Sequence, residues 1–221
     1  MLLTKKALKL LSSCPLFEGM DDGAIKAAVE SLDGYGRTYG KGEYLHRFGE
    51  PLTAFGLVLS GSVKVCSDDL DGNTMIMAEV RPGITFGESL CFLRVPDSPV
   101  YIYASEDTSV LWMKTDKLFS GSDTGLQRRF AVLLAHRTLS MNERIQILSK
   151  ISIREKLCVY FASLARSCGG REFTLTMNRE DLAAYIGANR SAMSRELSRM
   201  KRDGIIDCDG KKVKLLKTAD F

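Results

Sequence analysis

The period of the apolar positions changes twice along the chain. Residues 5–32 have a helical pattern, and Asp21 and Asp22 precede an apolar stretch as acidic residues often do in a first helical turn. From about Tyr35, short β-rich runs are separated by Gly, Asn, Asp and Pro. Many short strands at this spacing predict a double-sheet roll. The runs are residues 55–60, 62–66, 75–80, 100–104 and 109–113, with turns predicted at 71–73 and 81–83.

A helical pattern returns from about Asp116 to Arg166. Part of it follows a 4-3 repeat, which is typical of a seam between two helices. The seam residues are Gln127, Ala131, Leu134, Thr138, Met141, Ile145 and Leu148. Two interpretations remain open: the seam packs against a second subunit, which we favour, or it packs on the chain's own roll. Phe130 and Leu133 offer another face of the same helix for the roll.

Residues 178–202 predict two helices joined by a sharp turn. Asn178 and Asn189 are each placed to cap a helix, and Gly187 permits the turn between them. The inward faces of the two helices are Leu182, Ala183 and Ile186, then Met193, Leu197 and Met200. Residues 203–215 follow as a β-hairpin with a tight turn at 209–210, so the segment predicts a winged helix-turn-helix.

The second helix of this segment has a basic and polar face. Arg190, Ser191, Ser194 and Arg195 are spaced to point together. A helix-turn-helix places such a face in the major groove, where arginine reads guanine edges. Lysines of the hairpin's second arm suit phosphates. The sequence therefore predicts DNA contacts from Arg179, Asn189, Arg190, Ser191, Ser194, Arg195, Arg199, Lys211 and Lys212.

The charge distribution agrees with a nucleic-acid target. Residues 1–149 carry 16 Lys and Arg against 18 Asp and Glu, a net of −2. Residues 150–221 carry 15 against 9, a net of +6. A basic C-terminal part on a neutral-to-acidic N-terminal part indicates that the C-terminal part meets a polyanion.

Composition narrows the remaining classes. The 221 residues are 45% hydrophobic and 26% charged, as in an ordinary soluble protein. We find no apolar run long enough to cross a bilayer and no secretory signal, so we expect a cytoplasmic protein without a membrane partner. The six cysteines have spacings that suit neither zinc nor an iron–sulfur cluster, and we expect free thiols.

From about Leu11 to Leu216 the chain resembles the CRP/FNR family of bacterial transcription regulators. Residues 14–17 with Gly19 look like the family's opening segment, and residues 59–65 are similar to its barrel signature, in which Gly61 turns between strands. Residues 86–88 look like the start of its phosphate-binding cassette. The helical seam and the winged helix-turn-helix follow in the family's order.

The resemblance implies an α+β fold with three parts. Residues 1–115 form an effector-sensing, cyclic-nucleotide-binding-like β-roll (double-stranded β-helix), residues 116–150 a long dimerisation helix, and residues 151–221 the winged helix-turn-helix. It also implies a homodimer that binds a palindromic operator in double-stranded DNA under the allosteric control of a small-molecule effector, and contact with RNA polymerase if the protein is an activator. The implied effector pocket comprises Phe86, Gly87, Glu88, Ser89, Ser98, Tyr101, Leu139 and Ser140.

The effector is where the sequence departs from its cyclic-nucleotide-binding relatives. Those relatives place an Arg-Ser or Arg-Thr pair after the cassette glutamate, because a buried phosphate needs a charged donor. Ser98-Pro99 stands there instead, and proline has no backbone N–H. We therefore expect an effector other than cAMP, with Gly87 and Glu88 forming a tight turn and a bonded carboxylate.

Other family cofactors are not supported by the residues present. Iron–sulfur sensors cluster cysteines near the N-terminus, where this chain has only Cys14. Haem sensors need axial ligands, and the only histidines are His46 and His136. The cofactor is therefore left unknown.

The operator should differ from those of the better-known branches. Arg190 and Arg195 match arginines of the cAMP-binding members, whereas Ser191 replaces the glutamate that follows the first of them. Two alternatives from other classes remain: a roll-based enzyme such as a metal-dependent oxygenase, which needs clustered histidines with a carboxylate, and a protein-binding adaptor, which the basic hairpin disfavours. No catalytic or metal-binding residue is predicted.

Overall fold

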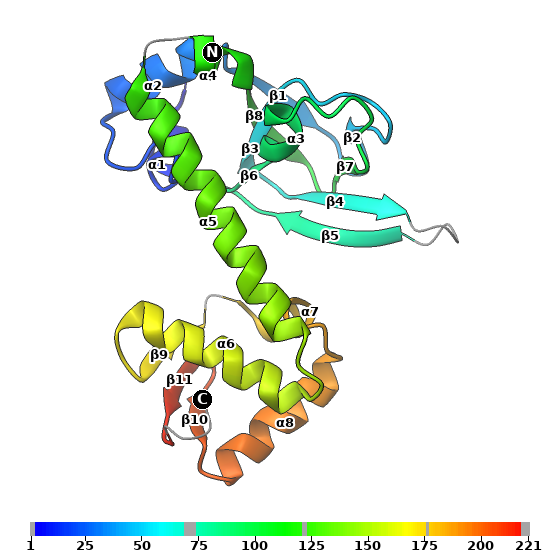
Figure 1. The fold of residues 1–221 in the computed structure, drawn as a ribbon, viewed down its shortest axis with the longest axis vertical. Helices are drawn as coiled ribbons and strands as arrows, with labels where there is room; N and C mark the ends of the chain where they lie inside the picture. Colours follow the sequence, from blue (N-terminus) through cyan, green and yellow to red (C-terminus); the bar gives the residue numbers. More distant parts are fainter. Residues whose placement is uncertain (1–2, 69–73, 121–122, 176, 218–221) are drawn as a thin grey trace. The chain divides into compact units, whose positions relative to one another are not determined.

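The computed structural model describes residues 3–68, 74–120, 123–175 and 177–217. Two compact units divide the chain, Met1–His136 and Arg137–Phe221. The long helix α5 (Thr124–Leu148) contributes to both (Figure 1).

The first unit begins with the predicted helical segment, which is interrupted. Helix α1 (Lys5–Ser12) is capped by Thr4, and helix α2 (Asp22–Ser31) by Asp21, whose carboxylate accepts from the Ala24 N–H. Residues 13–21 between them form turns. The helices therefore follow the pattern predicted for 5–32, with a break that the apolar spacing did not indicate.

Two antiparallel sheets of the described residues form the roll. One has the strand order β1-β8-β3-β6 and the other β2-β7-β4-β5 (Figure 1). The strands of the first sheet are β1 (Tyr35–Tyr39), β8 (Thr108–Met113), β3 (Phe55–Ser60) and β6 (Thr85–Phe86). Those of the second are β2 (Tyr44–His46), β7 (Tyr101–Ala104), β4 (Val63–Asp68) and β5 (Thr74–Val80). All five predicted strands are present, and the turn at 81–83 is confirmed, while the turn at 71–73 lies outside the described residues.

The two central strands of the first sheet are buried on both faces. Four consecutive side chains of β8, Val110 to Met113, are buried, as are residues 55–58 of β3. Leucines of α1 and Phe130 and Leu133 of α5 join the same core. Burial on both faces explains why these strands read as continuous apolar runs. Two short helices complete the unit, α3 (Glu88–Phe92) and α4 (Thr115–Ser120).

The helical pattern from Asp116 to Arg166 is divided between α4, α5 and α6 (Ile153–Cys168). The last break has a local cause. Ser152 and Glu155 form a capping box, in which the Ser152 hydroxyl accepts from the Glu155 N–H and the Glu155 carboxylate accepts from the Ser152 N–H. This S-x-x-E signature was present in the sequence and marks the start of α6.

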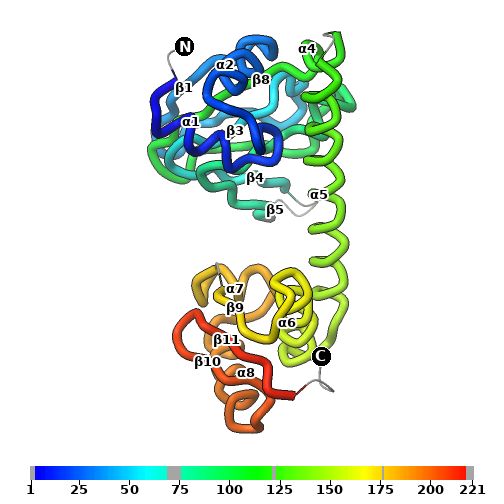
Figure 2. The backbone as a smooth tube through the Cα atoms, turned by 90° about the vertical axis from the view of Figure 1, so that its left-hand side faces the viewer, coloured from blue at the N-terminus to red at the C-terminus, as the bar shows by residue number. Residues whose placement is uncertain are grey.

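The second unit is a winged helix-turn-helix. Helices α6, α7 (Arg179–Tyr185) and α8 (Arg190–Arg202) share one core with a sheet of strand order β10-β11-β9 (Figure 2). The strands are β9 (Glu172–Thr174), β10 (Ile206–Asp209) and β11 (Lys212–Leu215). The predicted hairpin at 203–215 is confirmed, with β9 as a third strand that the sequence did not indicate.

Candidate nucleic-acid interface

The turn between α7 and α8 is fixed by both caps and by Gly187. The Asn178 side chain accepts from the Glu180 and Asp181 N–H groups, and Asn189 caps α8 in the same way. Gly187 has φ +61°, which disfavours any other residue. The end of α5 lies against this turn, since a Cβ on Gly187 would stand 2.9 Å from Leu148 Cδ2.

Helix α8 presents an apolar face inward and a basic face outward. Met193, Leu197 and Met200 are buried, as predicted. Arg190, Ser191, Arg195 and Arg199 are exposed, and Ser194 is half-buried. The buried stripe fixes the rotation of the helix about its axis, so the arginines of its N-terminal half are held toward solvent on a rigid support.

Two of the predicted polar contacts are already engaged in capping α8. The side-chain oxygen Oδ1 of Asn189 accepts from the Ser191 N–H at 2.9 Å and from the Ser191 hydroxyl at 2.6 Å. It also accepts from the Ala192 N–H. These bonds orient the first turn of α8. They leave the carboxamide nitrogen of Asn189 as the group that can point outward.

Arg179 ties the first helix to the wing. Its Nη2 donates to the carbonyl of Gly210, at the tip of the β10–β11 hairpin, over 3.0 Å. The side chain is half-buried and its Nη1 is covered without a hydrogen-bond partner among the described residues. The structure therefore places Arg179 as a link between helix and hairpin, next to the predicted phosphate-binding lysines.

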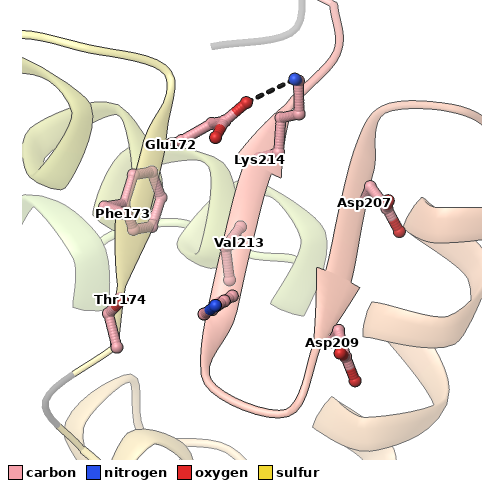
Figure 3. A pocket seen from close by; sticks show the side chains of 8 residues that line it. Glu172, Phe173, Thr174, Asp207, Asp209, Val213 and Lys214 are labelled. Carbon is pink, nitrogen blue, oxygen red and sulfur yellow. Dashed lines mark ion pairs between the residues drawn. The ribbon is translucent and has the colours of Figure 1, made fainter.

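The outer face of the wing sheet has a mixed charge. In register across the three strands lie Asp207, Lys214 and Glu172, and then Asp209, Lys212 and Thr174 (Figure 3). Lys214 forms an ion pair with Glu172, and Lys201 of α8 pairs with Asp207 over 2.8 Å. Lys212 thus lies between Asp209 and Thr174, while Lys211 is exposed at the hairpin tip. The basic arm seen in the sequence is largely balanced by carboxylates on its neighbours.

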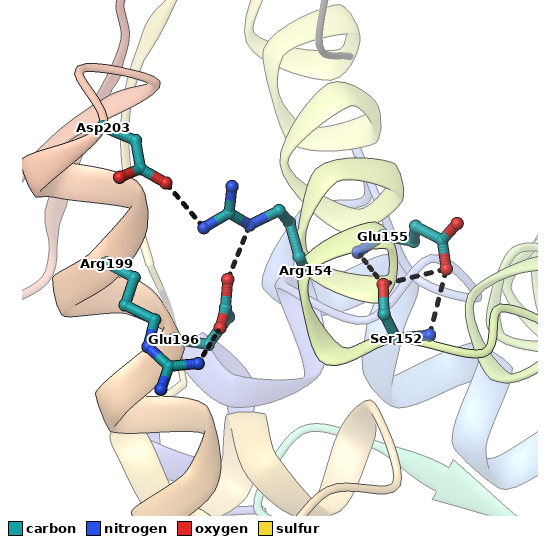
Figure 4. A network of polar contacts seen from close by, with 6 residues as sticks. All are labelled: Ser152, Arg154, Glu155, Glu196, Arg199 and Asp203. Carbon is teal, nitrogen blue, oxygen red and sulfur yellow. Dashed lines mark hydrogen bonds and ion pairs between the residues drawn. The ribbon is translucent and has the colours of Figure 1, made fainter.

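An arginine of α6 forms ion pairs with two carboxylates of α8 and its C-cap. Arg154 Nε donates to Glu196 Oε1 over 2.6 Å, and its Nη2 donates to Asp203 Oδ2 over 2.7 Å (Figure 4). The two carboxylates raise the pKa of the Arg154 guanidinium, Glu196 most strongly. Sequence reasoning missed this contact, because its partners are far apart along the chain.

The end of α5 packs on α7 through a cation–π contact. The Arg144 guanidinium lies 5.6 Å from the centroid of the Tyr185 ring, and Tyr185 packs on Tyr160 of α6 with ring centroids 5.3 Å apart. Burial raises the pKa of Tyr160 to about 12 and also raises that of Tyr185. Ile147 is fully buried in the same core. The last turns of the long helix are therefore part of the helix-turn-helix unit.

The 4-3 seam of α5 divides into two parts. Near its start the seam serves the roll, where Gln127 donates to the Leu118 carbonyl and Leu134 packs on the roll core. Further on it is exposed: Met141 is 64% and Ile145 60% accessible. Phe130 and Leu133 are buried on the roll, as predicted for that face.

The cassette residues of the predicted effector pocket serve the roll itself. Phe86 is buried edge-on against Trp112, with ring centroids 5.3 Å apart. Gly87 has φ +80° and starts α3. Glu88 is buried and accepts a hydrogen bond from the Thr85 hydroxyl. The cassette is thus a tight turn with a bonded carboxylate, as the sequence suggested.

The other predicted pocket residues differ in burial and in their local contacts. Ser98 is buried and its hydroxyl donates to the Val100 carbonyl over 3.0 Å, while the Tyr101 hydroxyl donates to Asp68 over 3.1 Å. Ser89 is exposed on α3. Leu139 and Ser140 are exposed on α5 and belong to the second unit, whereas all the others belong to the first.

The histidines and cysteines do not gather. Within the described residues, no group of three or more His, Cys, Asp or Glu could hold a metal ion. His46 is buried in β2, with its Nε2 lacking a hydrogen-bond partner in that part of the chain, and burial lowers the pKa of its imidazole. None of the six cysteines, which all lie in the described ranges, forms a disulfide bond. No helix in the described ranges is both long and apolar enough to span a membrane.

Comparisons with known proteins match both parts of the chain. The cyclic nucleotide-binding domain family matches residues 36–120, and the Crp-like helix-turn-helix domain family matches residues 155–220.

Curated relatives and solved structures agree with these matches. The chain is 28% identical to the transcriptional activator protein anr of Pseudomonas aeruginosa, over 89% of this chain and 85% of that protein. It is 29% identical to the anaerobic regulatory protein of Pasteurella multocida, over 77% of this chain and 64% of that protein. The catabolite activator protein of Thermus thermophilus superposes with a TM-score of 0.53 at 25% identity, covering 91% of this chain and 93% of that one. With both domains matched in this order, the chain belongs to the CRP/FNR family of DNA-binding transcription regulators.

Proposed function

We propose that this regulator acts as a homodimer that binds a palindromic operator, with α8 as the recognition helix. The observation that carries the proposal is the outward face of α8. Arg190 and Arg195 project from a helix whose opposite face is locked into the core by Met193 and Leu197. A rigidly held pair of arginines can reach guanine O6 and N7 in the major groove.

The remaining DNA contacts follow from this placement. Ser191, Ser194 and the Asn189 carboxamide nitrogen flank the arginines at the start of the helix. Arg199, one turn after Arg195, suits a phosphate, as do Lys211 at the wing tip and Lys212 beside it. Arg179 supports the wing through Gly210 and approaches the backbone of the same DNA segment.

Dimerisation follows from the exposed later part of the seam. Met141, Ile145 and Leu148 form an apolar stripe at 4-3 spacing on α5, which suits the same stripe of a second copy. A two-fold axis between the copies places the recognition helices about one DNA turn, ~34 Å, apart. We keep the functional division into residues 1–115, 116–150 and 151–221.

Control by an effector in the roll completes the proposal. The buried Ser98 hydroxyl and the Glu88 carboxylate are already bonded within the roll. These bonds disfavour a cyclic phosphate at this place. We propose that a small molecule other than cAMP binds the roll and shifts the dimer between two states with different DNA affinity. The protein works in the cytoplasm, where its DNA is, and contacts RNA polymerase if it activates.

Selection of bound sequences from a random duplex pool, with the purified full chain and no added ligand, tests the proposal. Enrichment of a two-fold-symmetric site is the expected result. If nothing is enriched, the selection is repeated with cell extract, which supplies a missing effector. A folded protein that enriches no site under either condition would refute the proposal.

A substitution in α8 sharpens the test. Arg195→Ala should weaken binding to the selected operator by about 1–3 kcal/mol per lost bidentate contact, while binding to unrelated DNA changes little. Arg202→Ala is the matched control at the end of the same helix.

The salt dependence of DNA binding tests the adaptor alternative. Phosphate contacts release counterions, so DNA affinity should fall steeply with salt. A DNA affinity that hardly changes with salt would favour the protein-binding adaptor.

A further inference from the structure

Arg154 connects two carboxylates of the recognition helix to α6. It is the second residue of α6, next to the Ser152–Glu155 capping box that fixes the start of that helix (Figure 4). Its two charge-assisted bonds, of 2.6 Å to Glu196 and 2.7 Å to Asp203, reach the middle and the C-cap of α8. Bonds of this kind are shorter and stronger than neutral ones.

Glu196 has a second cation beside it. The Arg199 Nη1 lies 3.5 Å from Glu196 Oε2, at the limit of a hydrogen bond, whereas Arg154 holds the other oxygen closely. The Glu196 side chain is only 14% accessible, and that of Arg199 is 60% accessible. Arg154 is therefore the main partner of Glu196, and Arg199 extends toward solvent.

The electrostatic consequence concerns DNA. A carboxylate on the recognition helix repels phosphates and competes with them for neighbouring arginines. With Arg154 present, the charges of Glu196 and Asp203 are compensated from behind the helix. Without it, Glu196 would face Arg199 as its nearest cation and draw it away from the surface.

We propose that Arg154 is a positioning residue for DNA binding: it occupies Glu196 and Asp203 from α6 and so keeps Arg199 available to a phosphate. Arg154 itself touches no DNA. This inference rests on the proposed function, because it needs α8 to be the helix that meets DNA.

A substitution cycle measures the coupling. The affinity of the full-chain protein for its selected operator is determined at several salt concentrations for Arg154→Met, Arg199→Gln and the two double variants Arg154→Met/Glu196→Gln and Arg154→Met/Arg199→Gln. The logarithm of the DNA-binding constant falls with the logarithm of the salt concentration, and loss of one phosphate contact per subunit makes this fall less steep by about 0.9 per subunit. Arg154→Met and Arg199→Gln should each show this less steep fall, with affinity about tenfold lower, a typical coupling between contacting residues.

The double variants distinguish positioning from mere stabilisation. Adding Glu196→Gln to Arg154→Met should restore the slope, because the competing charge is gone. Adding Arg199→Gln to Arg154→Met should lower it no further, because both act through one contact. Additive effects, or no restoration by Glu196→Gln, would overturn the proposal.

Two controls keep the result interpretable. Thermal unfolding shows whether Arg154→Met is folded. If it is not, Arg154→Lys replaces it and should give an intermediate slope, because lysine cannot bridge both carboxylates equally. An unchanged slope for Arg154→Lys overturns the inference. Arg195→Ala on the same operator tests the proposed function separately. If Arg195→Ala loses specificity and Arg154→Met changes nothing, only the positioning role fails.

Discussion

The meaning of a charged residue here depends on its neighbours. Lys214 is paired with Glu172 and Lys201 with Asp207, so neither offers a full charge to DNA. Such exposed pairs contribute little to stability, but they change the surface potential of the wing. Arg190 and Arg195, by contrast, project from the first turns of α8. The net charge of +6 of residues 150–221 therefore lies more on α8 than on the wing.

His46 gives the residue-scale prediction. Burial lowers the pKa of its imidazole, and Glu50 opposes this only partly. The unfolded chain therefore takes up a proton at a higher pH, near 6.5, than the folded chain, so this contribution to stability is complete above that pH and is lost as the pH falls below it toward the lower pKa of the folded state. Denaturant unfolding between pH 8 and 5, followed by the fluorescence of the buried Trp112, should show the roll becoming less stable.

A pair of variants isolates this residue. His46→Gln should flatten the pH dependence between 7 and 5, whereas His136→Gln, at an exposed position on α5, should leave it as in the wild type. A wild-type profile that is flat over this interval would contradict the prediction.

At the scale of elements, helix ends were decided by local signals. Asn178 and Asn189 cap α7 and α8 as expected from their sequence positions, because a cap depends on residues two or three positions away. The start of α6 had an equally local signal in Ser152 and Glu155. The apolar spacing alone did not indicate the break between α5 and α6, because a helical spacing continues on both sides of it.

The exposed stripe of α5 gives the element-scale prediction. Ile145→Glu should disrupt the proposed dimer, because it places a charge in the apolar seam; the expected weakening is about 30-fold or more, as for a central interface residue. Sedimentation equilibrium of the full chain measures it. Val132→Glu is the matched control, since Val132 is also exposed on α5 but lies on the opposite side of the helix from the seam.

Helix α5 also shows how one element serves several partners. Its start packs on the roll through Phe130 and Leu133, and its end joins the helix-turn-helix through Ile147 and Arg144. Met141 and Ile145 are exposed on the same helix, and we propose that they meet a second copy. Dimerisation that is insensitive to Ile145→Glu would mean that the copies meet through another surface.

At the scale of the whole molecule, the chain combines a roll with a DNA-binding unit that includes the last turns of α5. One of its matched families is the cyclic nucleotide-binding domain, yet we expect an effector other than cAMP. By its resemblance to the family, the Ser98 segment takes the place of an arginine of the cAMP-binding members, and the Ser98 hydroxyl donates to the Val100 carbonyl. A buried phosphate without a cationic donor is costly.

Calorimetry with cAMP tests this argument. We expect no binding at sub-millimolar concentration, either to the free protein or to its complex with the selected operator. Sub-millimolar binding of cAMP would show that donors other than those in the Ser98 segment hold the phosphate, and the effector proposal would then be wrong.

The sequence alone determined the succession of helical segment, β-roll, long helical region and winged helix-turn-helix, and the exposed arginines of α8. These depend on apolar period, caps and turn glycines, which are interactions between near neighbours in the chain. It also indicated that the Gly87–Glu88 turn serves the roll, which the Thr85–Glu88 bond agrees with.

Only the tertiary structure decided which charges are compensated. Arg154 and Glu196 are 42 positions apart, and Arg154 and Asp203 are 49 apart. Glu172 meets Lys214 only because β9 joins the hairpin as a third strand. Strand pairing and helix packing bring distant residues together, and a periodic pattern carries no information on which distant charge will lie opposite which. The sequence could therefore locate the proposed recognition helix, whereas the bonds of Arg154 to that helix became visible only in the fold.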